Sequence, residues 1–226
     1  MRIIKAVLFD FDGTLVNSLE AFLVAARLTL KSLDLPLLPK EKLVEIVKLP
    51  FDEWLSITIP PNTPKRTSIV DRFKSDYERF YRKNHLKFIK PINNAFLTLE
   101  RLREMGLSIG VMTARKLTTD YVRQEIEFLK FNKFINVLVT LNEISLQEPD
   151  KVSLILECTR RLNLKNCDCA VVGDSPEDIV AGKDVGALTI GASYGFYGQK
   201  IINYHPDFTI TTPLEILKIL DTFIQR

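Results

Sequence analysis

The sequence of 226 residues has no long apolar run, and this absence argues against a membrane-spanning helix and a secretory signal. A membrane-spanning helix requires roughly 18 consecutive apolar residues, and no segment approaches that length. The apolar run at the N-terminus ends as early as Asp10, so it lacks the longer core of a secretory signal. We therefore expect a soluble, cytoplasmic protein without a membrane partner.

Cysteine is scarce and the charges nearly balance. The chain has three cysteines, an odd number, and they lack the paired spacing of a zinc ribbon: Cys158, Cys167 and Cys169. We therefore expect buried thiols rather than a disulfide framework or a zinc site. The formal net charge of +3 is too small to indicate a nucleic-acid-binding protein, whose footprint is a strongly basic face. Hydrophobic residues make up 46% of the chain, which is typical of a globular protein with a real core.

Hydrophobic periodicity divides the chain into helical and mixed parts. Residues 3–9 are apolar and rich in β-formers, whereas residues 15–88 carry helical spacing. Pro50 and the stretch from Pro60 to Pro64 separate a short helix at 43–47 from a long one that carries Ile69. Asn17 with Glu20, and Thr212 with Glu215, have the spacing of helix caps.

After Pro91 helices and strands alternate. The predicted helices span 95–105, 119–129 and 151–162 and begin at Pro176 and Pro213, and the predicted strands span 107–112, 135–139, 170–172, 187–190 and 208–210. This alternation predicts an α/β fold with a doubly wound parallel sheet and an inserted all-helical cap domain. The predicted core domain comprises residues 1–14 and 89–226, and the predicted cap comprises residues 15–88.

Polar side chains follow three of the predicted strands. Asp10 and Asp12 follow the first strand, Thr113 follows the strand at 107–112, and Asp174 follows the strand at 170–172. The carboxyl ends of parallel strands form one edge of a sheet, where ligands bind. Asp10 and Asp12 are two positions apart, so both side chains can point to the same side. We expect these residues to share one pocket.

A second group of acids surrounds Asp174 in the segment Gly173-Asp174-Ser175-Pro176-Glu177-Asp178. Ser175 as a helix cap, with acids near the helix N-terminus, accounts for Glu177 and in part for Asp178, but not for Asp174. Four carboxylates in one place would repel one another and raise their pKa values, which a divalent cation would relieve. All-oxygen ligands favour Mg²⁺ over zinc.

These motifs resemble those of the haloacid dehalogenase superfamily, in its phosphoglycolate-phosphatase-like branch. The resemblance rests on Asp10-Phe11-Asp12-Gly13-Thr14-Leu15, on Thr113 after an apolar strand, and on the segment from Gly173 to Ile179. It extends over the full length of the chain, because a helical cap inserted after the first motif and the closing segment Asp207-Phe208-Thr209-Ile210 before a helix are also features of the family.

The resemblance implies roles for individual residues. Asp10 would be the nucleophile that forms an aspartyl-phosphate, and Asp12 would be the general acid and then the base. Thr113 would donate a hydrogen bond to the phosphoryl group. Mg²⁺ would be held by Asp10, Asp174 and the backbone carbonyl of Asp12, with support from Asp178.

One position departs from the family pattern. Family members usually carry a lysine before a proline in the loop after the third strand of the series, and the matching residue here is Glu148. A carboxylate there would repel the phosphoryl group. Lys116, Arg115 and Lys151 are the candidates for supplying the charge instead, and we include Lys116 among the predicted catalytic residues.

The predicted function is that of a Mg²⁺-dependent phosphatase acting on a small phosphorylated metabolite, as a monomer or homodimer and with no nucleic-acid partner. Three alternatives remain open: a phosphate-binding module with little catalysis, favoured by Glu148; a sugar phosphomutase that uses the same intermediate; and a metal-independent dehalogenase, which is disfavoured because that branch typically lacks the aspartate present here as Asp12. Residues 65–90 include nine basic and three acidic residues. This basic segment is either a lid that steers phosphates toward the site or the solvated face of a helix.

Overall fold

The chain folds into two compact units, which we describe separately. The structure, a computed structural model, describes residues 2–49, 51–115 and 118–224. One unit, here called the sheet unit, comprises Met1–Asn17 and Lys90–Arg226, and the other, the helical unit, comprises Ser18–Ile89. The role of a cap, which the sequence predicts for residues 15–88, stays a prediction.

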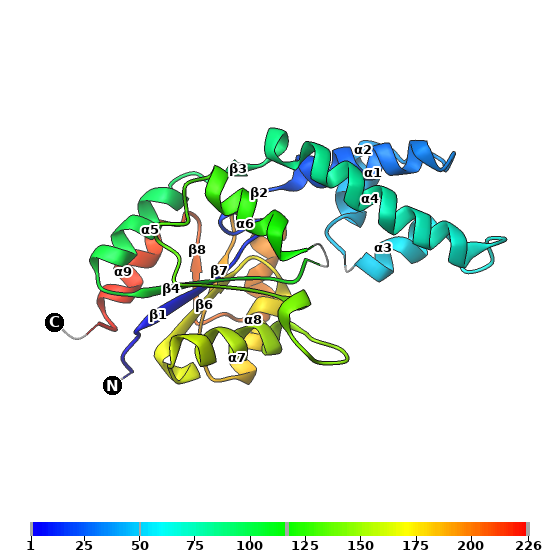
Figure 1. Ribbon diagram of the computed structural model, residues 1–226. Helices are drawn as coiled ribbons and strands as arrows, with labels where there is room; N and C mark the ends of the chain where they lie inside the picture. The colour runs from blue at the N-terminus through cyan, green and yellow to red at the C-terminus, as the bar shows by residue number, and fades with distance from the viewer. Residues whose placement is uncertain (1, 50, 116–117, 225–226) are drawn as a thin grey trace. The chain divides into compact units, whose positions relative to one another are not determined.

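The sheet unit is built on parallel strands in the order β5-β4-β1-β6-β7-β8 (Figure 1). These strands are β1 (Ala6–Asp10), β4 (Ser108–Thr113), β5 (Val137–Thr140), β6 (Cys169–Gly173), β7 (Leu188–Ala192) and β8 (Phe208–Ile210). The order confirms the predicted doubly wound parallel sheet. β1 pairs with β4 on one side and with β6 on the other, so the order reverses at β1, where such sheets bind ligands.

A two-stranded antiparallel ribbon pairs the two segments of the sheet unit that precede and follow the helical unit in the sequence. Its strands are β2 (Val16–Asn17) and β3 (Lys90–Pro91), with Val16 paired to Pro91. The chain leaves the sheet unit directly after β2 and returns to it at β3. The sequence analysis did not predict this ribbon, because two residues are too few to display a strand periodicity.

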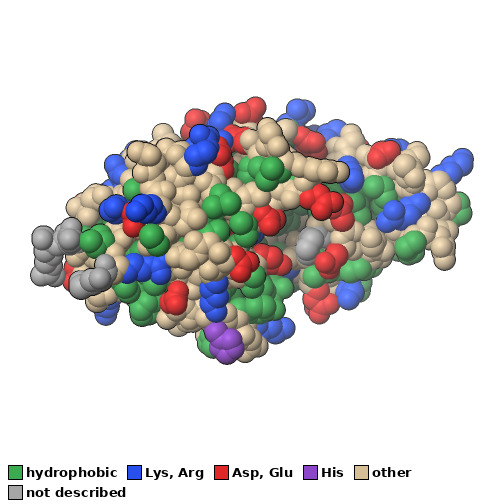
Figure 2. All heavy atoms as spheres, turned by 90° about the horizontal axis from the view of Figure 1, so that it is seen from below, with side chains coloured by type: hydrophobic (Ala, Val, Ile, Leu, Met, Phe, Trp, Pro, Cys, Tyr) green, Lys and Arg blue, Asp and Glu red, His purple; other side chains and the backbone are tan. Residues whose placement is uncertain are grey.

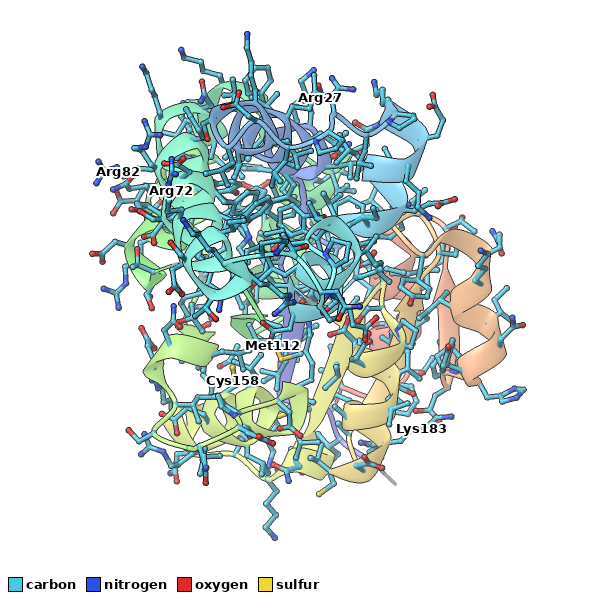
Figure 3. All side chains as sticks on the ribbon, turned by 90° about the vertical axis from the view of Figure 1, so that its right-hand side faces the viewer. Arg27, Arg72, Arg82, Met112, Cys158 and Lys183 are labelled. Atoms are coloured by element: carbon cyan, nitrogen blue, oxygen red, sulfur yellow. The ribbon has the colours of Figure 1, made fainter. Side chains whose placement is uncertain are left out.

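Helices cover both faces of the sheet. The helices of this unit are α5 (Ala95–Glu104), α6 (Thr119–Phe128), α7 (Lys151–Leu162), α8 (Pro176–Asp184) and α9 (Glu215–Asp221). α7 and α8 pack on one face, and α5 and α9 lie together on the opposite side (Figure 1). Side chains alternate along a strand, so Ala6 and Leu8 of β1 face α7, and Met112 joins them near Cys158 (Figure 3). Cys158 and Cys169 are buried free thiols, and Cys167 is an exposed one.

The described part of the helical unit contains helices and no strand. The helices are α1 (Leu19–Ser32), α2 (Lys40–Ile46), α3 (Phe51–Thr58) and α4 (Arg66–Phe88). α1 packs along α4, and the Trp54 ring of α3 lies edge-on to Phe73 and Tyr77 of α4. The described part of this unit is therefore all-helical as expected, but residues 15–17 of the predicted cap belong to the sheet unit, where Val16–Asn17 forms β2. The sequence analysis missed α3, because the prolines that flank it in the sequence indicate a linker.

Two of the predicted helix caps were wrong, because the N-cap residues are Ser18 for α1 and Leu214 for α9 rather than Asn17 and Thr212. Glu215 accepts hydrogen bonds from the backbone N–H and the hydroxyl of Thr211, each at 2.7 Å, instead of pairing with Thr212. The local turn decides which of two adjacent polar residues faces the helix end, and spacing alone does not reveal it.

Charged side chains of both signs are interspersed on the face shown in Figure 2. Arg72 and Arg82 of α4 are exposed and project away from the helical unit (Figure 3), as a solvated helix face would place them. Within the described ranges, no helix is both long enough and apolar enough to cross a membrane.

Replacing Ile155 by alanine should lower the free energy of unfolding by about 2–5 kcal/mol, because this fully buried side chain of α7 packs against the sheet and would leave a cavity. Its neighbour Leu156 is 45% exposed and provides the control, since Leu156→Ala should change stability by no more than about 0.5 kcal/mol. Urea denaturation measures both, and equal losses would contradict this account of the core.

Candidate active site

The strand order brings the predicted polar residues to one edge of the sheet. Asp10 is the last residue of β1, Thr113 is the last residue of β4, and Asp174 directly follows β6. β4, β1 and β6 are neighbours in the sheet, so Asp10 lies between the other two strand ends. The sheet topology therefore places all three residues at its carboxyl edge.

Three carboxylates gather next to this edge. Asp10, Asp174 and Asp178 are 5%, 3% and 0% exposed, and each offers an oxygen within 4.8 Å of the others. Buried carboxylates this close repel one another unless positive charge is present. Within the sheet unit that charge comes from Lys151, whose ammonium contacts the Asp10 carboxylate and lies 2.7 Å from Asp178 Oδ1.

The start of α7 determines where Lys151 lies. Asp150 caps the helix by accepting a hydrogen bond from the Ser153 N–H at 2.8 Å, which makes Lys151 the first helical residue. The sequence predicts this helix at 151–162, as observed, but it does not connect Lys151 to Asp10. Glu148 is exposed. Lys116, which the sequence analysis included among the catalytic residues, lies outside the described residues.

Asp174 is held from two sides by backbone and hydroxyl donors. The Phe196 N–H donates to Asp174 Oδ2 at 2.5 Å, and the Thr14 hydroxyl donates to Oδ1 at 3.2 Å. A Cβ at Gly195 would lie 2.2 Å from the Asp174 Cβ, so only glycine permits this approach. The sequence analysis missed this loop after β7. Its signal, two glycines among aromatic residues, indicates a turn without indicating what the turn contacts.

The turn after β1 also depends on glycine. Gly13 has a φ of +82°, and a Cβ there would lie 2.5 Å from Asp174 Oδ2. On the other side of the site, Asp178 Oδ2 accepts hydrogen bonds from the Ser175 hydroxyl at 2.7 Å and from the Ser175 backbone N–H at 3.2 Å, and the second belongs to a capping box at the predicted cap Ser175. The first and last motifs are thus packed directly against each other.

Burial raises the pKa values of two of the site carboxyls, those of Asp10 and Asp174. Burial, together with the charge of Asp178, raises the pKa of Asp174 to about 7, against the opposing effect of the Phe196 N–H. The pKa of Asp10 is raised mainly by burial, although Lys151 opposes the shift. For Lys151, burial alone would lower the pKa, but the charges of Asp10 and Asp178 outweigh it and raise the pKa. Lys151 is therefore a permanent cation.

Asp12 belongs to a different group of contacts. Its Oδ2 accepts a hydrogen bond of 2.6 Å from Arg115 Nε, and its Oδ1 accepts one from Arg115 Nη2. The Thr113 hydroxyl lies 3.4 Å from the same Oδ2. The Asp12 carboxylate is thus not part of the cluster formed by Asp10, Asp174 and Asp178, and the sequence analysis had in any case expected its backbone carbonyl as the ligand.

Carboxylates outnumber cations in the described cluster, because Asp10, Asp174 and Asp178 share the ammonium of Lys151. Two further acids, Asp12 and the buried Glu125 of α6, contact Arg115 instead, and Arg115 Nη1 donates to Glu125 Oε2 at 2.8 Å. The remaining negative charge and the purely oxygen donor set suit a hard divalent cation.

Comparison with known proteins agrees with this architecture. Residues 7–192 match the model of the haloacid dehalogenase-like hydrolases. A Clostridium perfringens protein with the provisional name pyrophosphatase PpaX is 30% identical over 96% of this chain and 98% of its own. Pyrophosphatase PpaX of Bacillus cereus is 28% identical over 96% of each chain. The crystal structure of a "predicted phosphoglycolate phosphatase" from Haemophilus somnus superposes with a TM-score of 0.84 at 23% identity, covering 96% of this chain and 97% of the other.

A doubly wound parallel sheet with a buried acidic cluster at its carboxyl edge is an α/β architecture with a candidate metal site. The chain belongs to the haloacid dehalogenase-like hydrolases. This membership confirms the predicted family, fold and enzyme class.

Without added metal, stability should fall as the pH rises from about 4 to about 7. The pKa of Asp174 is 3.8 in its ordinary state and about 7 in the folded protein, so the folded state binds more protons across this interval and loses that advantage as they dissociate. Asp174→Asn should flatten the dependence of the melting temperature on pH, whereas Asp184→Asn, at the exposed end of α8, should retain it. An unchanged slope in Asp174→Asn would contradict the prediction.

Proposed function

We propose that the protein is a Mg²⁺-dependent phosphatase that hydrolyses a small phosphorylated molecule through an aspartyl-phosphate on Asp10. The observation that carries this proposal is the position of Asp10: it ends the strand at which the sheet order reverses, next to the Lys151 ammonium and beside Asp174 and Asp178. A carboxylate supported by positive charge on one side can act as a nucleophile toward an anionic phosphate.

The residues present fit a magnesium ion. Asp10, Asp174 and Asp178 are buried oxygen donors that lie within reach of a single ion, and the excess of carboxylates over cations leaves negative charge for it to neutralise. Asp10 and Asp174 would bind it together with the Asp12 carbonyl, and Asp178 would support it. When bound, the ion would reduce the repulsion between the Asp10 carboxylate and the phosphate.

In the first half of the reaction, Asp10 attacks phosphorus and forms a new P–O bond while the bond to the leaving oxygen breaks. The Lys151 ammonium, which contacts Asp10, would stabilise the negative charge of the phosphoryl group during the transfer. Thr113, at the end of the adjacent strand β4, would donate its hydroxyl to a phosphoryl oxygen.

In the second half, water attacks the acyl phosphate and Asp10 is released. Asp12 would accept the proton from this water, because it follows the nucleophile by two residues and its carboxylate is held by Arg115 as an acceptor. In this proposal, Asp10 carries the phosphoryl group and Asp12 transfers protons.

The Lys151 ammonium also bears on the alternatives. The alternative of a binding module with little catalysis was based on Glu148, which stands where family members usually have a lysine. Lys151 supplies a cation next to Asp10, so this argument against catalysis no longer applies. The names of the relatives make inorganic pyrophosphate one substrate to test beside phosphorylated sugars and acids. A mutase would release no net free phosphate, so phosphate release distinguishes it from a phosphatase. We also propose that the helical unit covers the site as a cap.

The variant Asp10→Asn should lower hydrolysis of p-nitrophenyl phosphate by at least about 10³-fold, because the amide cannot form the covalent intermediate. Wild-type hydrolysis should require Mg²⁺ and stop with a chelator. Phosphate release and the rate with and without Mg²⁺ are the measurements. Hydrolysis that persists in Asp10→Asn would refute the proposed function.

Lys151→Ala should lower kcat by about 10²- to 10³-fold, since a phosphoryl group on Asp10 would lose the cation that contacts this carboxylate. Glu148→Ala, at the position where the family usually has lysine, is the matched control and should stay close to wild type because its side chain is exposed. Steady-state kinetics of both variants decide the matter. If Glu148→Ala altered kcat as strongly as Lys151→Ala, the loop rather than the helix start would act on the phosphate.

A further inference from the structure

A tyrosine hydroxyl connects the two loops that enclose Asp174. Tyr194 lies in the loop after β7, and its hydroxyl donates a hydrogen bond of 3.1 Å to the backbone carbonyl of Thr14. Thr14 belongs to the turn after β1, so this contact joins segments that are 180 residues apart in the chain. The reaction steps proposed above make no use of Tyr194.

Hydrogen bonds connect Tyr194 to Asp174 in a closed ring. The Thr14 hydroxyl donates to Asp174 Oδ1 at 3.2 Å, while the Thr14 carbonyl accepts from Tyr194. Two residues after Tyr194, the Phe196 N–H donates to Asp174 Oδ2. The ring therefore holds both oxygens of the Asp174 carboxylate, one from each loop. A shift of either loop would change the direction in which these oxygens point.

The loop that carries Tyr194 is anchored at its start. The Ser193 N–H and the Ser193 hydroxyl both donate to the Ile210 carbonyl of β8, each at 2.9 Å. The Gly195 N–H donates to the Ala192 carbonyl at 3.2 Å, which closes a tight turn around the tyrosine. Because the backbone on both sides of Tyr194 is held in this way, its hydroxyl can fix the position of the turn after β1.

We infer that Tyr194 is a positioning residue for the metal site, which keeps Asp174 and the turn that carries Asp12 in the arrangement that binds Mg²⁺. This inference rests on the proposed function, in which Asp174 and the Asp12 carbonyl are ligands. Tyr194 acts through its hydrogen bond to Thr14. A side chain that orients a ligand indirectly changes the affinity for the metal.

The size of the expected effect follows from the number of hydrogen bonds between each residue and the metal. Residues that directly support a metal ligand typically change metal affinity by about 10- to 100-fold, and Thr14 is in this position. Tyr194 is one hydrogen bond further away. Loss of one neutral hydrogen bond changes an equilibrium constant by roughly 2- to 10-fold, so Tyr194 should contribute less than Thr14.

The experiment measures Mg²⁺ binding to the metal-free whole chain by isothermal titration calorimetry, without substrate. Tyr194→Phe removes only the hydroxyl and should raise the Kd for Mg²⁺ by about 3- to 10-fold. Tyr204→Phe, which removes the hydroxyl of an exposed tyrosine further along the same segment, is the matched control and should bind Mg²⁺ like wild type.

Variants of Thr14 test the path through which Tyr194 acts. Thr14→Val should raise the Kd for Mg²⁺ by at least about 10-fold, whereas Thr14→Ser keeps a hydroxyl and should bind close to wild type. Because both residues hold the same carboxylate, the double variant of Tyr194→Phe and Thr14→Val should weaken binding by less than the product of the two separate effects.

A merely structural role for Tyr194 would give a different result. It would lower the melting temperature of the metal-free Tyr194→Phe protein and leave its Kd for Mg²⁺ unchanged. In the positioning role, the loss of p-nitrophenyl phosphate hydrolysis in Tyr194→Phe at low Mg²⁺ should be recovered as the Mg²⁺ concentration is raised.

The inference is overturned if Tyr194→Phe binds Mg²⁺ like wild type, if Tyr204→Phe weakens binding equally, or if the effects of Tyr194→Phe and Thr14→Val multiply. These outcomes leave the proposed function intact when wild type binds Mg²⁺ and hydrolyses the substrate. Wild-type protein that binds no Mg²⁺ would refute the proposed function and this inference together.

Discussion

The site depends on one ammonium group placed among buried carboxylates. Asp10, Asp174 and Asp178 could not be packed this closely at the sheet edge as three anions without compensation, and Lys151 supplies part of it through its contacts with Asp10 and Asp178. The cost of burying Lys151 is offset by the same contacts. A divalent cation would supply the rest, so the amine and the metal share the task of neutralising the acids.

The arrangement separates two kinds of acid within a short stretch of chain. Asp10 lies on the side of the site occupied by Lys151 and the other buried carboxylates, while Asp12 lies on the side of Arg115 and Glu125. Because each aspartate has its own cation, the two carboxylates do not compete for one. In the proposed function, this separation would let one carboxylate act on phosphorus and the other on protons, although the two residues are almost adjacent in sequence.

The sequence was sufficient for the parallel sheet and for the convergence of Asp10, Thr113 and Asp174, because strand periodicity and the strand-end rule act over short distances. It was insufficient for contacts made between distant segments. Arg115 and Lys151 were only two of three candidate cations, and nothing in the sequence indicated that each would pair with a different aspartate. α3 was missed because neighbouring prolines outweighed its short apolar pattern, and the ribbon of β2 and β3 is too short to carry any pattern.

The Phe196 N–H that holds Asp174 comes from a segment outside the part of the chain that matches the family model, which ends at residue 192. A backbone donor leaves no trace in side-chain identity, so changes in the length or course of this segment can reorient Asp174 while every motif residue stays the same. Two members of the family with identical motifs can therefore differ in their affinity for the metal, and the origin of that difference would lie in a loop that motif comparison ignores.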